Sequence, residues 1–270
     1  MEAPRLVASD VDGTLLGLGP LVSERTAAAV ARVRESGTPF VLVTGRPPRW
    51  VPDVARSAGH DGLAVCANGA VLYDVGADRV LWQRCLEPVQ LSDLADAADS
   101  ALPGSALAAE RVGATAFDDD VRQFVAENSY QHPWAGSDQV DVSRAEVLGH
   151  PAVKLLVEHG EMTSGQMAEA LEAVLGDAFA VTFSTDSGMV EISAAGVTKA
   201  TGLADVAQRY GVRADDVVAF GDMPNDVPML RWAGHGVAMS GGHPEALAAA
   251  DEVTAPSTED GVALVLERWF

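Results

Sequence analysis

Cysteine, lysine and long apolar runs are all scarce in this chain of 270 residues. Its two cysteines, Cys66 and Cys85, are too few for the disulfide framework of a secreted domain, so we expect reduced thiols. No apolar run approaches the roughly 20 residues that a membrane-spanning helix needs. The N-terminal stretch reaches the acidic pair that begins at Asp10 too soon for a secretory signal peptide. We therefore expect a cytoplasmic protein.

Positive charge is the next shortage. The chain has 18 Lys and Arg against 39 Asp and Glu, which gives a formal net charge of −21. The negative electrostatic field of such a chain repels nucleic-acid phosphates and anionic lipids. We therefore expect neither nucleic acid nor a membrane as a partner. Lysine occurs only at Lys154 and Lys199. If the ligand is an anion, cations have to gather at one place against the overall field.

Short apolar runs alternate with helical patterns in the first and last thirds of the chain. Runs such as FVLVT at Phe40–Thr44 and VVAF at Val217–Phe220 are typical of parallel strands buried on both faces. Ser23–Glu35 and Ala200–Tyr210 are typical of helices. This order predicts an α/β fold with a doubly wound, mainly parallel, Rossmann-like core sheet.

The middle of the chain has a different pattern. It predicts helices over Leu91–Leu102 and Asp119–Asn128, and a hairpin from Phe179–Ser184 and Met189–Ser193. A segment of about 100 residues has the size of a small domain. We therefore predict a core of residues 1–82 plus 191–270, with an inserted α+β cap domain over residues 83–190.

Polar clusters follow several predicted core strands. Asp10–Thr14 follows the first strand, Thr44-Gly45-Arg46 ends the second, and Gly221–Asp226 follows VVAF; Lys199 opens a helix. Ligands of parallel sheets bind at the carboxyl ends of the strands, so these clusters are expected to meet. Crowded carboxylates need a neutralising cation, and Mg²⁺ with a substrate phosphate suits that role.

The first cluster suggests a chemistry. Asp10 can attack phosphorus as a covalent nucleophile. Asp12 can protonate the leaving group and then deprotonate a water, since residues i and i+2 of a strand share a face. Gly13 would provide the turn. Each motif alone also has a structural explanation, as a turn, a helix N-cap or a surface lysine, but their combination and order favour a phosphoryl site.

These residues also resemble a known family. DVDGT at Asp10–Thr14, VTGRP at Val43–Pro47, Lys199 and GDMPND at Gly221–Asp226 resemble the four motifs of the haloacid dehalogenase superfamily of phosphatases. ANGA at Ala67–Ala70, VEISAAGVTK before the third motif and EDGVA near the end resemble its Cof-type branch, with a type IIB cap. The resemblance covers nearly all of the core and is weak over the cap. It departs from the family pattern at Ala200 and in the loop of residues 240–242.

The resemblance implies roles for the first two motifs. Asp10 would be the nucleophile and a Mg²⁺ ligand. Asp12 would be the general acid and base, and it would bind the metal through its backbone carbonyl. Thr44 would hold phosphoryl oxygens, and Gly45 and Arg46 would contact phosphate or substrate.

It also implies roles for the later motifs. Lys199 would hold phosphoryl oxygens and offset the charge of Asp10, while Asp222 would complete the metal site. Asn225 would contact phosphate, and Asp226 would orient Lys199 or a metal-bound water. The resulting hypothesis is a Mg²⁺-dependent phosphomonoester hydrolase that acts through an aspartyl-phosphate intermediate. Its expected substrates are small phosphorylated metabolites, with sugar phosphates as the favoured class.

Two alternatives stay open at this point. A phosphomutase, of the phosphomannomutase kind, would use the same motifs, and a non-catalytic phosphometabolite-binding protein could share the fold. The sequence leaves the substrate and the oligomeric state undetermined. Four cap residues are candidates for reading the substrate: Arg122, His132, Trp134 and Lys154.

Overall fold

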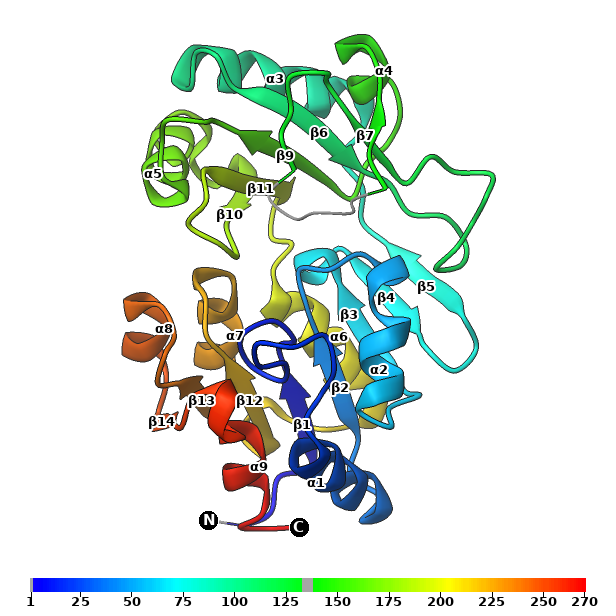
Figure 1. Ribbon diagram of the computed structural model, residues 1–270, viewed down its shortest axis with the longest axis vertical. Coiled ribbons are helices and arrows are strands. Elements are labelled where there is room, and N and C mark those ends of the chain that lie inside the picture. Colours follow the sequence, from blue (N-terminus) through cyan, green and yellow to red (C-terminus); the bar gives the residue numbers. More distant parts are fainter. Residues whose placement is uncertain (1, 133–137) are drawn as a thin grey trace. The chain divides into compact units, whose positions relative to one another are not determined.

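The computed structural model describes residues 2–132 and 138–270 (Figure 1). It consists of two compact units, which we call the core unit, Met1–Trp82 with Thr198–Phe270, and the inserted unit, Gln83–Val197. The structure places the return to the core seven residues after the expected position. The reason is strand β11, Met189–Ala194, which pairs with strands of the inserted unit before the chain leaves it.

The core unit is built on a sheet whose described strands run in the order β14-β13-β12-β1-β2-β3-β4-β5. The pairings from β14 to β3 are parallel, and β4 adds an antiparallel strand. The mainly parallel, doubly wound α/β sheet is therefore confirmed. Its strands are β1 (Leu6–Ser9), β2 (Phe40–Val43), β3 (Leu63–Cys66), β4 (Val71–Asp74), β5 (Arg79–Gln83), β12 (Val217–Gly221), β13 (His235–Met239) and β14 (Glu252–Thr254).

Helices cover both faces of this sheet (Figure 1). On one face, Leu203 and Val206 of α6 and Met229 of α7 pack with alternate strand residues in an apolar cluster. Burying such side chains is the main source of stability for this layer. The core helices are α1 (Glu24–Glu35), α2 (Pro52–Ser57), α6 (Lys199–Tyr210), α7 (Val227–Trp232), α8 (Pro244–Ala249) and α9 (Gly261–Leu266).

The inserted unit is an α+β structure with a sheet in the order β10-β11-β9-β6-β7-β8 among the described residues. Its pairings are antiparallel except for that of β7 with β8. Besides β11, the strands are β6 (Ala106–Glu110), β7 (Phe124–Ala126), β8 (Val140–Asp141), β9 (Lys154–Glu158) and β10 (Phe179–Thr182), and the helices are α3 (Pro88–Ala101), α4 (Arg144–Leu148) and α5 (Ser164–Leu175).

One predicted element of the inserted unit is wrong. Residues 119–128 were expected to form a helix, but Phe124–Ala126 is strand β7 and pairs antiparallel with β6. Both Phe124 and Val125 are buried there. Pairing with β6, together with burial of side chains on both faces of the strand, outweighs the local preference for helix. That preference is worth roughly a few tenths of a kcal/mol per residue.

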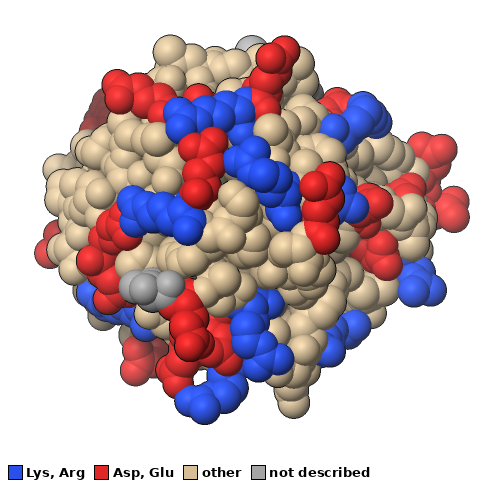
Figure 2. Space-filling view, turned by 90° about the horizontal axis from the view of Figure 1, so that it is seen from below, with Lys and Arg blue, Asp and Glu red and all other residues tan. Residues whose placement is uncertain are grey.

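The surface mixes charges of both signs. Figure 2 shows one face of the molecule on which basic and acidic side chains lie next to each other. Partly exposed ion pairs of the core unit include Arg25–Glu267 at 2.6 Å and Arg268–Glu252 at 2.7 Å. Within the described residues, every helix is too short or too polar to cross a bilayer.

Candidate active site

The strand order of the core unit brings three polar loops together. Strand β1 lies between β12 and β2, with Ser9 in register with Phe220 on one side and Leu42 on the other. The backbone N–H of Asp10 donates to the carbonyl of Phe220 at 2.9 Å, one residue past the end of β1. Because these strands are parallel, their carboxyl ends meet at one edge of the sheet. Asp10, Thr44 and Asp222 all begin loops there.

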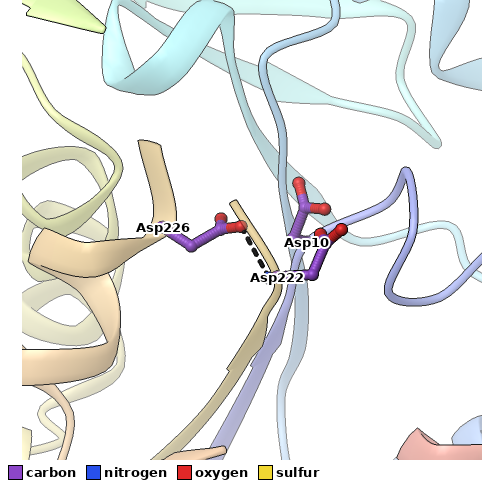
Figure 3. A group of neighbouring side chains, drawn as sticks. All are labelled: Asp10, Asp222 and Asp226. Atoms are coloured by element: carbon purple, nitrogen blue, oxygen red, sulfur yellow. Dashed lines mark hydrogen bonds between the residues drawn. The ribbon is translucent and has the colours of Figure 1, made fainter. Parts of the chain in front are cut away.

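Three carboxylates gather at this edge. One oxygen from each of Asp10, Asp222 and Asp226 lies within 4.8 Å of the other two. Figure 3 shows the carboxylates of Asp10 and Asp222 side by side and that of Asp226 directed toward the backbone of Asp222. Asp10 and Asp226 are buried, so water screens their charges poorly. Such a cluster requires compensating positive charge.

Lys199 supplies part of that charge. Its Nζ donates to Oδ1 of Asp10 and to Oδ1 of Asp226, both at 2.6 Å. Thr198 caps helix α6 through a hydrogen bond from the backbone N–H of Thr201, which fixes the backbone where Lys199 starts. Burial alone lowers the pKa of Lys199, but the two carboxylates raise it above its ordinary value. The lysine is therefore a fixed cation.

The pKa values of two carboxylates reflect the crowding. Burial raises the pKa of Asp10 well above its usual range, and Lys199 opposes that rise. Burial, together with the charge of Asp226, raises the pKa of Asp222 to about 7, although a hydrogen bond from Thr14 at 3.0 Å lowers it. Both groups would favour the ionised form more strongly beside a divalent cation.

Asp226 differs from the other two carboxylates because both of its oxygens are engaged. Oδ1 accepts from Lys199, and Oδ2 accepts from the backbone N–H of Met223 at 3.0 Å. Oδ2 also accepts from the backbone N–H of Asp222 at 2.9 Å, the bond drawn in Figure 3. These bonds fix the loop that carries Asp222. Asp226 therefore orders the site, and Asp10 and Asp222 are the side chains best placed to bind a metal ion.

Gly13 is required next to Asp222 for two reasons. Its φ is +78°, in the left-handed region that favours glycine. A Cβ atom at this position would lie 2.2 Å from Oδ2 of Asp222. The turn after Asp12 is therefore in direct contact with the carboxylate of the fourth motif.

Asp12 lies apart from the carboxylate cluster. Strand β1 ends at Ser9, so Asp10 and Asp12 lie in the following loop, and the expectation that they share a strand face is wrong. Both oxygens of Asp12 accept from Arg46, at 2.7 Å from Nε and 2.5 Å from Nη2. The Asp12 side chain is 60% exposed, which leaves it accessible to solvent and ligand.

The second motif forms a tight loop after β2. Thr44 is fully buried, its N–H donates to the carbonyl of Val65, and its Oγ1 accepts from the N–H of Arg46 at 3.0 Å. The hydroxyl proton of Thr44 can therefore be donated to another group. Gly45 lies between these two residues in the same loop.

Asn225 is hydrogen-bonded to Asn68, a residue to which the sequence assigned no role. Its Nδ2 donates to Oδ1 of Asn68 at 3.1 Å, and its own Oδ1 is buried without a hydrogen-bond partner among the described residues. Thr14, bonded to Asp222, is a second such residue. Asn68 lies in the ANGA motif and Thr14 in the DVDGT motif. Each is a polar side chain within a motif that resembles the family, and that feature could have identified them as site residues.

The loop of residues 240–242 also contacts the site. The N–H of His243 donates to the backbone carbonyl of Asp222 at 2.7 Å, and a Cβ on Gly242 would lie 2.7 Å from the same oxygen. The loop thus supports the fourth motif through backbone contacts. Its departure from the family pattern removes no side chain that the site uses.

Three of the four candidate cap residues can be located within the inserted unit. Lys154 is buried and ion-paired with buried Glu191. His132 packs edge-on against Phe124, with ring centroids 5.0 Å apart, and Arg122 is exposed. Trp134 lies outside the described residues.

Known proteins resemble this chain along its whole length. A family model described as haloacid dehalogenase-like hydrolase matches residues 7–266. Two phosphatases of Bacillus subtilis, both named for 5-amino-6-(5-phospho-D-ribitylamino)uracil, are 29% and 28% identical; they match over 99% and 98% of this chain and 98% and 95% of their own lengths.

A solved structure agrees in fold. That of BT4131, described as a subclass IIB sugar phosphatase, is 20% identical with a TM-score of 0.80, over 97% of this chain and 98% of that one. Together with the family match, this likeness confirms the resemblance that the four motifs predicted. The chain belongs to the haloacid dehalogenase-like hydrolases and is a Cof-type phosphatase of that family.

Proposed function

We propose that this protein is a Mg²⁺-dependent phosphomonoester hydrolase of the cytoplasm that forms an aspartyl-phosphate on Asp10. The observation that carries the proposal is the pairing of buried Asp10 with Lys199 at 2.6 Å, inside a cluster of three carboxylates. A lysine so close opposes the protonation of Asp10 that burial favours, and it offsets charge on an incoming phosphoryl group. The inserted unit acts as the cap domain, whose residues choose the substrate.

The donor set fits Mg²⁺. Asp10 and Asp222 offer carboxylate oxygens, and their pKa values are raised first by burial and then by the neighbouring carboxylates, an unfavourable setting for negative charge that a bound cation would relieve. The backbone carbonyl of Asp12 is the third expected ligand. Mg²⁺ prefers oxygen ligands and commonly uses one or two carboxylates plus substrate phosphate. When bound, it would neutralise charge on the phosphoryl group.

The protein groups divide the reaction into two steps. In the first, an oxygen of Asp10 forms a bond to phosphorus while the bond from phosphorus to the leaving oxygen breaks. Asp12, released from Arg46 and carrying a proton taken from solvent, gives that proton to the leaving oxygen. In the second, Asp12 takes a proton from water, whose oxygen bonds to phosphorus as the Asp10–phosphorus bond breaks. Inorganic phosphate leaves and Asp10 is regenerated.

We propose that Thr44, Lys199 and Asn225 hold the phosphoryl oxygens during both steps. Each can donate a hydrogen bond, and Gly45 gives the ligand close access to the backbone. Donors that are already ordered before the substrate binds stabilise developing negative charge without reorganisation. Asp226 orients Lys199, and Arg46 holds Asp12 between turnovers.

The substrate we propose is a phosphomonoester of a small sugar or sugar alcohol. The two Bacillus subtilis relatives are named for a phosphorylated ribityl compound, and BT4131 is described as a sugar phosphatase. 5-Amino-6-(5-phospho-D-ribitylamino)uracil is therefore the first compound to assay. Hexose phosphates come next.

The test is a screen of phosphorylated metabolites with Mg²⁺, with free phosphate as the readout. Wild type should release phosphate without an added bisphosphate, and Asp10→Asn should lose at least about 1,000-fold in kcat. Asp53→Asn, an exposed aspartate of helix α2, is the matched control and should keep wild-type activity. Full turnover by Asp10→Asn would reject the covalent mechanism, and phosphate transfer without release would identify a mutase.

A further inference from the structure

The turn that follows strand β3 has an unusual backbone. Three consecutive residues, Ala67, Asn68 and Gly69, have φ values of +49°, +54° and +101°. Left-handed backbone costs an alanine roughly 1–2 kcal/mol, while asparagine and glycine tolerate it better. Such strain persists only where the surrounding structure holds the conformation in place.

The loop of the second motif and the start of helix α6 both contact this turn through the backbone. The N–H of Asn68 donates to the carbonyl of Thr44 at 3.1 Å, and the N–H of Ala67 donates to the carbonyl of Arg46 at 2.9 Å. A Cβ on Gly69 would lie 2.0 Å from the carbonyl oxygen of Thr198, next to Lys199. The turn therefore touches the second motif and the start of helix α6.

The side chain of Asn68 reaches a third loop. Its Oδ1 accepts from Nδ2 of Asn225 at 3.1 Å, and 157 residues separate the two. Asn68 is 3% exposed and Asn225 is 6% exposed, so water competes little for this bond. The left-handed backbone thus carries a short polar side chain that bonds to the loop of the fourth motif.

This bond determines which end of the Asn225 amide is available as a donor. The amide has two N–H groups and one oxygen, and an anionic phosphoryl oxygen can only accept. Asn68 occupies one N–H, so the second remains for a ligand.

We infer that Asn68 is a positioning residue of the phosphoryl site, which acts by fixing the carboxamide of Asn225 with its nitrogen toward a bound anion. The inference rests on the proposed function for the identity of that anion. Without Asn68, the turn no longer fixes the orientation of the amide, which can then present its oxygen and repel phosphate. The strained turn is then the means of placing Asn68 opposite Asn225.

A double-mutant cycle tests this role. Asn68→Gly removes the acceptor and tolerates the left-handed backbone, and Asn225→Ala removes the amide. With p-nitrophenyl phosphate, we expect Asn68→Gly to lower kcat/KM about 10-fold, the value of one charge-assisted hydrogen bond. The double variant should be no less active than Asn225→Ala alone. Losses that multiply would mean that Asn68 only shapes the turn, and would overturn the inference.

The same four proteins should also be titrated calorimetrically with inorganic phosphate in Mg²⁺, a measurement that needs no turnover. Coupled losses of phosphate affinity would support the positioning role even if the wild type hydrolyses no ester, which would reject the proposed function alone. Additive losses would reject the inference while the hydrolase stands. If the wild type neither hydrolyses esters nor binds phosphate, both fail.

Discussion

The Nζ atom of Lys199 lies 2.6 Å from Oδ1 of Asp10, although 189 residues separate them in the chain. The same nitrogen is 2.6 Å from Oδ1 of Asp226. One buried cation thus links the first motif to the last. The site depends on both segments of the core unit.

Lys199→Met tests the importance of this link. The change leaves Asp10 and Asp226 buried without their cation, so we expect a loss of about 3–5 kcal/mol in the free energy of unfolding. Turnover should fall at least about 100-fold because the charge beside the nucleophile is gone. Urea unfolding and phosphate release measure the two effects. Arg213→Met, at an exposed ion pair, should change neither; near-wild-type turnover by Lys199→Met would contradict the assigned role.

Gly13→Ala should damage the site more than the backbone alone explains. A matched change is Gly37→Ala, since Gly37 has a φ of +83° and open space around its Cβ position. Both variants should lose roughly 1–2 kcal/mol from left-handed strain. Only Gly13→Ala also displaces Asp222, so only it should need more Mg²⁺ for half-maximal activity. Equal Mg²⁺ dependence in the two variants would show that the contact with Asp222 is unimportant.

Mg²⁺ should stabilise the folded protein. At about 100 times its Kd, the ion should add about 2.7 kcal/mol to the free energy of unfolding, which a rise in Tm will detect. Asp222→Asn should abolish the rise, whereas Asp53→Asn should retain it. Chelation with EDTA should stop turnover, and added Mg²⁺ should restore it. A Tm and a rate that both ignore EDTA would count against a metal site here.

His60 predicts a loss of stability in mild acid. Burial lowers the pKa of His60 to about 4, against 6.5 for an exposed histidine, and its ring packs edge-on against Phe40. The unfolded chain takes up the proton first, so the contribution is complete above pH 6.5 and is lost as the pH falls toward 4. Between pH 7.5 and 5, this amounts to about 2 kcal/mol.

The variant His60→Phe separates the contribution of His60 to the pH dependence of stability from that of the many carboxylates. Urea unfolding at both pH values should show that the variant loses about 2 kcal/mol less than the wild type. A constant difference between the two proteins, at pH 7.5 and at pH 5, would mean that His60 titrates alike in the folded and unfolded states.

Much of the site was predictable because its residues follow strands. An apolar run followed by Asp10, or by Gly221 and Asp222, marks the carboxyl end of a parallel strand, and such ends meet in any sheet of this type. The pattern did not indicate that Asp12 pairs with Arg46, since that contact depends on the path of a loop. The strand pattern alone did not separate the roles of Asp222 and Asp226, which only the family resemblance distinguished, because the difference depends on which carboxylate oxygens the backbone occupies.

The inserted unit was harder to predict because its strands have weak local signals. Strand β6 reads ALAAE, a composition that favours helix, and it becomes a strand by pairing with both β7 and β9. β7 is half as long as an average strand. Asn68 was missed as a site residue for a related reason, since its importance lies in a contact with a residue far along the chain.

The pairing of β1 with β12 determines how late in synthesis the core sheet can form. Leu6 lies opposite Val217, so the central strand pair of the core waits for about 200 further residues, roughly 10–40 s at ordinary rates of translation. The inserted unit is contiguous and is fully synthesised before that partner appears. During this interval the apolar N-terminal strands are exposed, and the nascent chain is open to chaperones and to aggregation.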